Sequence, residues 1–219
     1  MDNALLLSGT PKIEAGRVVL TFDDGPGPRS AELVQLLHER AVPATFFLLG
    51  ESLQRYGSSL DSYREHGHTI ALHGEQHRPF SSPHRALDQL NRCRDRLSGY
   101  LGETIWFRPP YGIADLTVPG YAGPVGWHAH GWDWDVTYRR GQTVIGCVDT
   151  IVDTLVRSQG GIVLLHDFAP YSEFTQAGLT EAQLDLRVLE ISALLIDRLR
   201  ELGFVLGGLP EQLPGGVHA

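Results

Sequence analysis

The chain has 219 residues, of which 42% are hydrophobic, so it is long enough and apolar enough for one domain with a substantial core. Its net charge of -8 at pH 7 argues against nucleic-acid binding, which depends on basic contacts to phosphate. No segment approaches the roughly 20 apolar residues of a membrane span, so we expect no membrane insertion. The N-terminal sequence lacks the basic and apolar regions of a secretory signal, and we therefore expect a cytoplasmic protein.

Short runs of β-branched or aromatic residues alternate along the chain with longer segments of helical periodicity. The strands are predicted at residues 17–22, 44–49, 69–72, 105–107, 161–165 and 204–206. The helices are predicted at residues 30–41, 51–65, 83–100, 144–156 and 184–202. Ser30 and Ser82 are the predicted N-caps of two of these helices. Repeated strand–helix units indicate an α/β fold with a mostly parallel sheet, either open or closed into a barrel.

The two cysteines, Cys93 and Cys147, belong to no C-x-x-C pair, so neither a thiolate zinc site nor a disulfide framework is indicated. We expect two ordinary, half-buried thiols.

The predicted strand at residues 17–22 runs directly into two adjacent acids, Asp23 and Asp24. The sequence Asp-Gly-Pro is typical of a turn, which explains the presence of Asp24 but not that of Asp23. Two carboxylates so close together repel each other, and a nearby cation or arginine would relieve that repulsion. Functional side chains in parallel α/β folds gather at the C-terminal ends of strands, where both acids lie.

Other predicted strands also end at polar residues. His73 and His77 follow the third strand, and a spacing of four residues is common among metal ligands, although a HxxxH pair alone is a weak signal. Arg108 precedes two prolines, which fix the backbone and suit a side chain that must be held in position. His166 follows the apolar strand GIVLL. A histidine at this position can either cap the strand or take part in catalysis, and the residues alone leave both roles possible.

In this order, the segments TFDDGP, HxxxH, RPPYG, DW and LLHD resemble the five motifs of the NodB-type polysaccharide deacetylase family (carbohydrate esterase family 4). The resemblance extends over residues 21–167, about two thirds of the chain. It implies a distorted (β/α) barrel, expected to have seven strands, and a single catalytic domain over residues 1–219. It also implies hydrolytic removal of acetyl groups from amino sugars or polysaccharides with one divalent metal ion.

The resemblance assigns the metal to Asp24, His73 and His77, a ligand set that suits zinc, with cobalt or nickel as alternatives. Such an ion would polarise the acyl oxygen and lower the pKa of a bound water. Asp23 would be the general base, and Arg108 would orient it.

The same resemblance makes His166 the general acid, with Asp133 holding it in its protonated form. The backbone N–H of Tyr111 would help to stabilise the oxyanion. Trp134 and Leu164 would form the walls of a small acyl pocket.

Two positions depart from the family pattern: Gly74 replaces a Ser or Thr, and His130 stands where an acid is frequent. We expect His128 and His130 either to alter substrate choice or to be ordinary loop histidines. The remaining histidines outside the motifs are expected to have no role in the chemistry: His38, His66, His68, His84 and His218.

The leading hypothesis is N-deacetylation of an amino sugar or oligosaccharide. A second hypothesis is a metal-dependent amidase, deformylase or imide hydrolase acting on a small acylated substrate. A third is a catalytically silent sugar-binding module that uses Trp127, Trp132 and Trp134 as stacking platforms. A silent module could lose Asp23 or His166, and because both are present the sequence argues against it.

Overall fold

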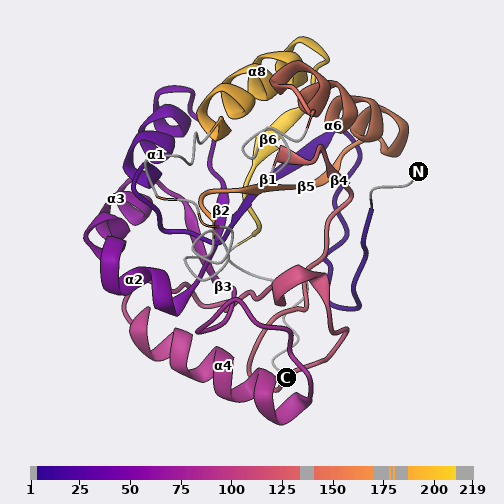
Figure 1. Ribbon diagram of the computed structural model, residues 1–219. Coiled ribbons are helices and arrows are strands. Elements are labelled where there is room, and N and C mark those ends of the chain that lie inside the picture. Colours follow the sequence, from indigo (N-terminus) through magenta and orange to yellow (C-terminus); the bar gives the residue numbers. More distant parts are fainter. Residues whose placement is uncertain (1–3, 134–140, 170–177, 179, 181–186, 211–219) are drawn as a thin grey trace.

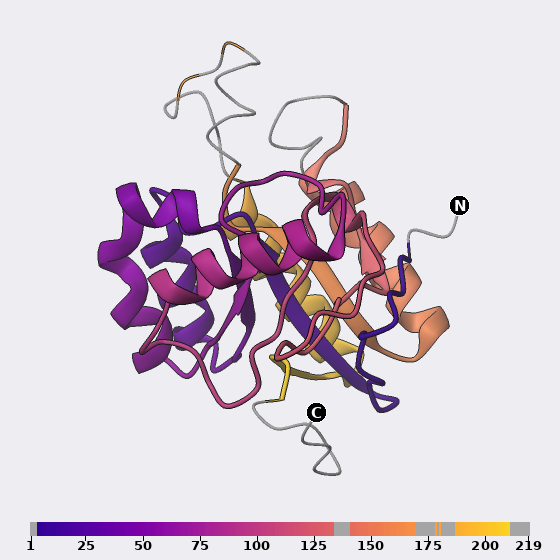
Figure 2. The same ribbon diagram turned by 90° about the horizontal axis from the view of Figure 1, so that it is seen from below.

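The computed structural model describes residues 4–133, 141–169, 178, 180 and 187–210. Its strands are β1 (Arg17–Asp23), β2 (Thr45–Leu48), β3 (Thr69–Leu72), β4 (Ala129–His130), β5 (Gly161–His166) and β6 (Val205–Gly207). Its helices are α1 (Ser30–Glu39), α2 (Gly50–Tyr56), α3 (Leu60–Glu65), α4 (Pro83–Arg96), α6 (Val144–Ser158) and α8 (Val188–Glu201), with short turns η1 (Gly57–Ser59) and η2 (Pro110–Gly112). Figures 1 and 2 show these helices arranged round the outside of the strands, which confirms the α/β class.

The named strands form one parallel sheet with the order β3-β2-β1-β5-β4, and β6 also pairs with β1. β1 lies at the centre, so its last residue has a neighbour on each side. Asp23 is in register with Phe47 of β2 and with His166 of β5. The pairing therefore brings the acid that ends β1 next to the histidine that ends β5.

A loosely paired segment joins the two edges of this sheet. Residues 105–108 hydrogen-bond to β3 on one side and to residues 122–125 on the other, over 2.8 to 3.0 Å. The chain then continues through residues 126–130 to β5, where His128 N donates to Ile162 O over 2.8 Å. The sheet thus curves round on itself, as expected for a distorted (β/α) barrel.

Two apolar clusters lie on opposite faces of the curved sheet. The larger cluster contains Val18, Leu20 and Phe22 of β1 together with residues of the surrounding helices. The smaller cluster contains no helix residue and includes Val19, Phe47, Ala71, Trp106, Val125, Ile162 and Leu209. Side chains alternate between the two faces of a strand. The inward positions at the C-terminal ends of these segments are therefore Asp23, His73, Arg108 and His166.

Two predicted elements take a different form in the structure, and one further strand is present. The helix expected at residues 51–65 is divided into α2, η1 and α3, because Gly57 and the two serines that follow it are weak helix formers. The strand expected at residues 105–107 is present only as single parallel bridges at Trp106 and Phe107. Strand β4, by contrast, was not predicted. The expected seven strands thus correspond to the six named strands together with the bridged segment at residues 105–107.

The predicted half-burial of the cysteines is wrong. Cys93 and Cys147 are both fully buried in the larger apolar cluster. Burial raises the pKa of the Cys93 thiol to about 12 and also raises the pKa of Cys147. Both thiols are therefore protonated, unreactive parts of the core.

Across the described ranges, no helix is both long enough and apolar enough to cross a bilayer.

Candidate active site

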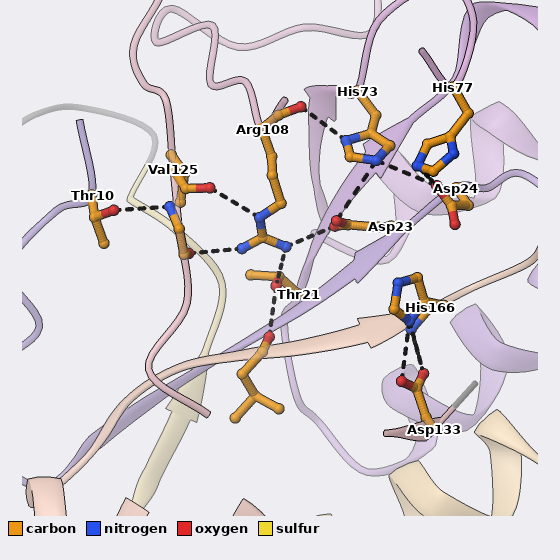
Figure 3. A network of polar contacts seen from close by, with 12 residues as sticks. Thr10, Thr21, Asp23, Asp24, His73, His77, Arg108, Val125, Asp133 and His166 are labelled. Atoms are coloured by element: carbon orange, nitrogen blue, oxygen red, sulfur yellow. Dashed lines mark hydrogen bonds and ion pairs between the residues drawn. The ribbon is translucent and has the colours of Figure 1, made fainter. Parts of the chain in front are cut away.

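Arg108 is fully buried inside the barrel and points toward Asp23 (Figure 3). Its Nη1 donates to Asp23 Oδ1 over 2.7 Å and to Thr21 Oγ1 over 2.8 Å. Its Nε and Nη2 donate to the carbonyl oxygens of Val125 and Gly126, each over 3.0 Å. The guanidinium is therefore fixed by four acceptors, and it holds one oxygen of Asp23 in place.

Asp24, His73 and His77 meet beside Asp23 (Figure 3). Asp24 Oδ1 lies 3.3 Å from His73 Nε2 and 3.5 Å from His77 Nε2. Asp24 has a φ of +71°, a left-handed conformation that turns the chain directly after β1. His73 Nδ1 is hydrogen-bonded to the carbonyl oxygen of Arg108 over 2.9 Å, so its Nε2 faces Asp24.

These three residues fit a divalent cation. Their ligand atoms all lie within 4.8 Å of one another. Asp24 is 1% exposed, yet neither of its carboxylate oxygens accepts a hydrogen bond from the described part of the chain. Burial would raise the pKa of Asp24, but the neighbouring His77 and His73 outweigh burial and lower it. A buried, charged oxygen donor beside two imidazoles is a suitable set for zinc and similar ions.

His166 lies across the site, paired with Asp133 (Figure 3). Its Nδ1 is 3.1 Å from both carboxylate oxygens of Asp133, and its backbone N–H donates to Asp133 Oδ2 over 2.8 Å. Burial alone would favour the neutral ring, but the charge of Asp133 outweighs it and raises the pKa of His166 to about 9. His166 is therefore protonated at neutral pH and can donate a proton from Nε2.

The inward side chains enclose a cavity of about 110 Å³, enough for a few water-sized groups. It is lined by Asp23, Asp24, His73, His77, Tyr111, Gly112, Trp127, Leu164 and His166. Arg108 and Asp133 lie behind this wall and contact it through Asp23 and His166. Trp134, predicted as a wall of the acyl pocket, lies outside the described residues.

Tyr111 and Gly112 belong to η2, a turn with left-handed backbone at both positions. Their φ angles are +59° and +66°. The Tyr111 ring lies 4.2 Å from the ring of His77, between ring centroids, and so packs against a proposed metal ligand. A Cβ added at Gly112 would come within 2.8 Å of the Trp127 ring and 2.3 Å of Leu5, so this close approach requires glycine.

The sequence did not identify Trp127 and Thr21 as parts of the site. Trp127 entered only as a stacking platform in the silent-module hypothesis, but it lines the cavity, and its ring lies 5.7 Å from the Arg108 guanidinium. Thr21 accepts a hydrogen bond from Arg108 and donates one to Val163 O. Thr21 could have been found from alternation alone, because it shares the inward face of β1 with Asp23.

Among the described residues, the histidines outside the motifs do not line the cavity, and His218 lies outside that part of the chain. His128 Nδ1 accepts from Ile162 N over 3.0 Å, so its ring satisfies the backbone of β5. His130 packs against Trp132, with ring centroids 4.4 Å apart, and burial lowers the pKa of His130. His68 is buried and accepts from a backbone N–H, and burial lowers its pKa to about 4.

Asp167 stabilises the turn that carries the two site acids. Its backbone N–H donates to Asp23 O over 2.9 Å, and its buried carboxylate accepts from Ser30 Oγ and Tyr63 Oη over 2.8 and 2.9 Å. Burial raises the pKa of Asp167 to about 6, against the opposing effect of these hydrogen bonds. The prediction of Ser30 as an N-cap is therefore wrong: its hydroxyl is used by Asp167 and by Gly27 N, and α1 begins at Ser30 itself.

Residues 11–135, more than half of the chain, match the family model described as polysaccharide deacetylase. The chain belongs to this family. The NodB-type resemblance read from the five motifs is thereby confirmed.

Relatives within the family have several named substrates. The chain is 32% identical to a chitooligosaccharide deacetylase of Sinorhizobium fredii (strain NBRC 101917 / NGR234), over 90% of this chain and 92% of that protein. It is 29% identical to a peptidoglycan-N-acetylglucosamine deacetylase of Bacillus cereus, over 78% of this chain and 81% of that protein. The fold is similar to the chitin deacetylase of the fungal pathogen Colletotrichum lindemuthianum, with a TM-score of 0.75, 22% identity and coverage of 97% and 95%.

Proposed function

We propose that the chain is a metal-dependent deacetylase that hydrolyses the N-acetyl group of an amino sugar or oligosaccharide. The observation that carries this proposal is the convergence on one cavity of a metal-ligand set, a second carboxylate and a protonated histidine. The deacetylases of chitooligosaccharides, peptidoglycan and chitin among its relatives and fold neighbours support an acetylated amino sugar as the substrate.

Asp24, His73 and His77 are the proposed ligands of a single divalent ion, with zinc favoured over cobalt or nickel. When bound, such an ion supplies a Lewis acid that polarises the acyl oxygen and makes a water acidic near neutral pH. The inward direction of all three side chains and the unsatisfied oxygens of Asp24 support this assignment.

Asp23 is the proposed general base. Arg108 holds its Oδ1, while its Oδ2 lies 3.8 Å from His73 Nε2, on the side of the metal-ligand group. Oδ2 can therefore accept the proton of the attacking water, and Arg108 keeps the carboxylate in position during that transfer.

His166 is the proposed general acid. Amide hydrolysis needs protonation of a poor leaving group, and a histidine protonated at neutral pH meets this need. Asp133 holds Nδ1, so Nε2 is the nitrogen that donates to the departing amine. The Tyr111 N–H is proposed to stabilise the oxyanion, and Leu164 and Trp134 to limit the size of the acyl group.

We infer that residues 1–219 form one catalytic domain, because the sheet and the bridged segment at residues 105–108 include residues from both halves of the chain.

A substrate panel tests the proposed function. Zinc-loaded protein is incubated with N-acetylglucosamine, N-acetylated chito-oligosaccharides, a formamide series and cyclic imides. We expect acetate release from the sugars. Formate release or ring opening without acetate release would instead support the small-substrate amidase hypothesis, and no product from any substrate would contradict both.

A further inference from the structure

The loop between His73 and His77 contains a buried acid that belongs neither to the metal-ligand group nor to the cavity wall. Glu75 is 3% exposed. A buried carboxylate is costly unless a charge and hydrogen bonds compensate it. The residue before it, Gly74, has a φ of +98° and no side chain, so it can hold this loop only through its backbone.

The partner of Glu75 is Arg96, the last residue of α4. Arg96 Nε lies 3.0 and 2.9 Å from the two carboxylate oxygens of Glu75, and Arg96 Nη2 donates to Oε1 over 2.7 Å. This forked arrangement fixes both the orientation of the Glu75 carboxylate and its distance from Arg96, whereas a single hydrogen bond would fix only the distance. Arg92, one turn earlier, adds a weaker contact at 3.9 Å.

The loop is also held from α2, the helix that lies beside α4 in Figure 1. Glu51 N donates to the carbonyl oxygen of Glu75 over 2.8 Å, and Gly50 N to that of Gly74 over 3.0 Å. A Cβ added at Gly50 would lie 2.0 Å from Glu75 Oε2, so α2 approaches the carboxylate as closely as glycine permits. On the α4 side, Gln89 Oε1 accepts from Gln76 N over 3.0 Å.

The two proposed metal ligands His73 and His77 lie at the ends of this five-residue loop, so the position of Glu75 between them can affect their separation. We propose that the Glu75–Arg96 ion pair positions these two histidines and thereby sets the metal affinity of the site. The inference depends on the proposed metal site. The Arg96 side chain is 37% exposed, and an ion pair with an exposed partner contributes little to stability, so we assign the pair a role in fixing the loop geometry.

The test is zinc affinity, measured by competition with a chromophoric chelator, on the wild type and on Glu75→Gln. The amide preserves the shape of the side chain but removes the charge that orients Arg96. We expect Glu75→Gln to fold and to bind zinc about 10 to 100 times more weakly, the usual cost of losing a group that orients a metal ligand. Its kcat at saturating zinc should recover, because the reacting groups are intact.

Arg94→Met is the matched control, since Arg94 lies on the same helix but pairs with the exposed Asp95. Its zinc affinity should equal that of the wild type. Zinc binding by Glu75→Gln that equals the wild type would overturn the inference. If Glu75→Gln does not fold, Arg96→Lys decides: the inference requires weakened zinc binding, and unchanged binding overturns it. A wild type that binds no zinc would contradict the proposed function itself.

Discussion

Arg108 Nη1 donates to Asp23 Oδ1 over 2.7 Å in an ion pair that is buried on both sides. Arg108 belongs to the segment that joins the two edges of the sheet, and Asp23 ends the central strand. The same guanidinium also bonds the carbonyl oxygens of Val125 and Gly126. One side chain thus fixes the direction of the proposed base and links three segments of the barrel wall.

Arg108→Met should destabilise the fold, because it leaves Asp23 buried without its partner. Removing one member of a buried pair costs about 3–5 kcal/mol. Urea unfolding of the variant and the wild type at pH 7 measures this loss. Arg157→Met, at an exposed arginine of α6, is the control and should leave the unfolding midpoint unchanged. A free energy of unfolding unchanged in Arg108→Met would show that the pair does not support the fold.

Asp23→Asn and Asp24→Ala should separate catalysis from metal binding. Asp23→Asn keeps the side-chain shape but cannot accept the proton, so kcat should fall by about 10²–10⁴ while bound metal stays near one ion per chain. Asp24→Ala removes a ligand and should lose the metal itself. Elemental analysis beside acetate release distinguishes the two effects, and near-wild-type turnover by Asp23→Asn would exclude its role as base.

The pH profile should report the protonation of His166. Its pKa is raised to about 9, and the general acid must be protonated, so kcat/KM should fall as pH rises through about 9. Asp133→Asn removes the charge that raises this pKa and should move the alkaline limb to lower pH. An alkaline limb at the same pH in both proteins would mean that another group controls it.

The same pair contributes to stability. Because the pKa of His166 is higher in the folded chain than its ordinary 6.5, this stabilisation is complete below pH 6.5 and is lost as pH rises through 9. Asp133→Asn should therefore reduce the free energy of unfolding more at pH 6 than at pH 10. A reduction of the same size at both pH values would contradict this linkage.

Tyr63→Phe should destabilise the chain in a pH-dependent way. It removes the hydrogen bond to the buried carboxylate of Asp167, and such bonds to charged groups contribute about 1.5–3 kcal/mol. The pKa of Asp167 is about 6, so its carboxylate is charged at pH 8 and largely protonated at pH 5. Urea unfolding should show a larger loss of stability at pH 8 than at pH 5. An equal loss at both would show that the charge of Asp167 is not involved.

The family motifs assigned the proposed site residues, and two local regularities explain why several of them lie together in the structure. Side chains alternate along a strand, and the ends of parallel strands meet at one edge of the barrel. Asp23, His73 and His166 lie at inward positions where predicted strands end, so their convergence needed no knowledge of the loops.

The parts that were missed depend on contacts between residues distant in sequence. Glu75 and Arg96 are 21 positions apart in the sequence. They can pair only because the end of α4 lies next to the loop between His73 and His77. The sequence around Ser30 predicts a helix cap, but in the structure the Ser30 hydroxyl donates to Asp167, which is 137 positions away. Strand β4 has two residues, too few to show any alternation, so the place of Trp127 just before it was not recognised.

The most direct test of the account is acetate release from an N-acetylated chito-oligosaccharide by chelator-treated protein during titration with zinc. The account predicts no release from the metal-free protein and activity that rises to a plateau at one zinc ion per chain, with Asp24→Ala inactive throughout. Full activity in the metal-free protein, or activity in Asp24→Ala equal to the wild type, would contradict the proposed metal site.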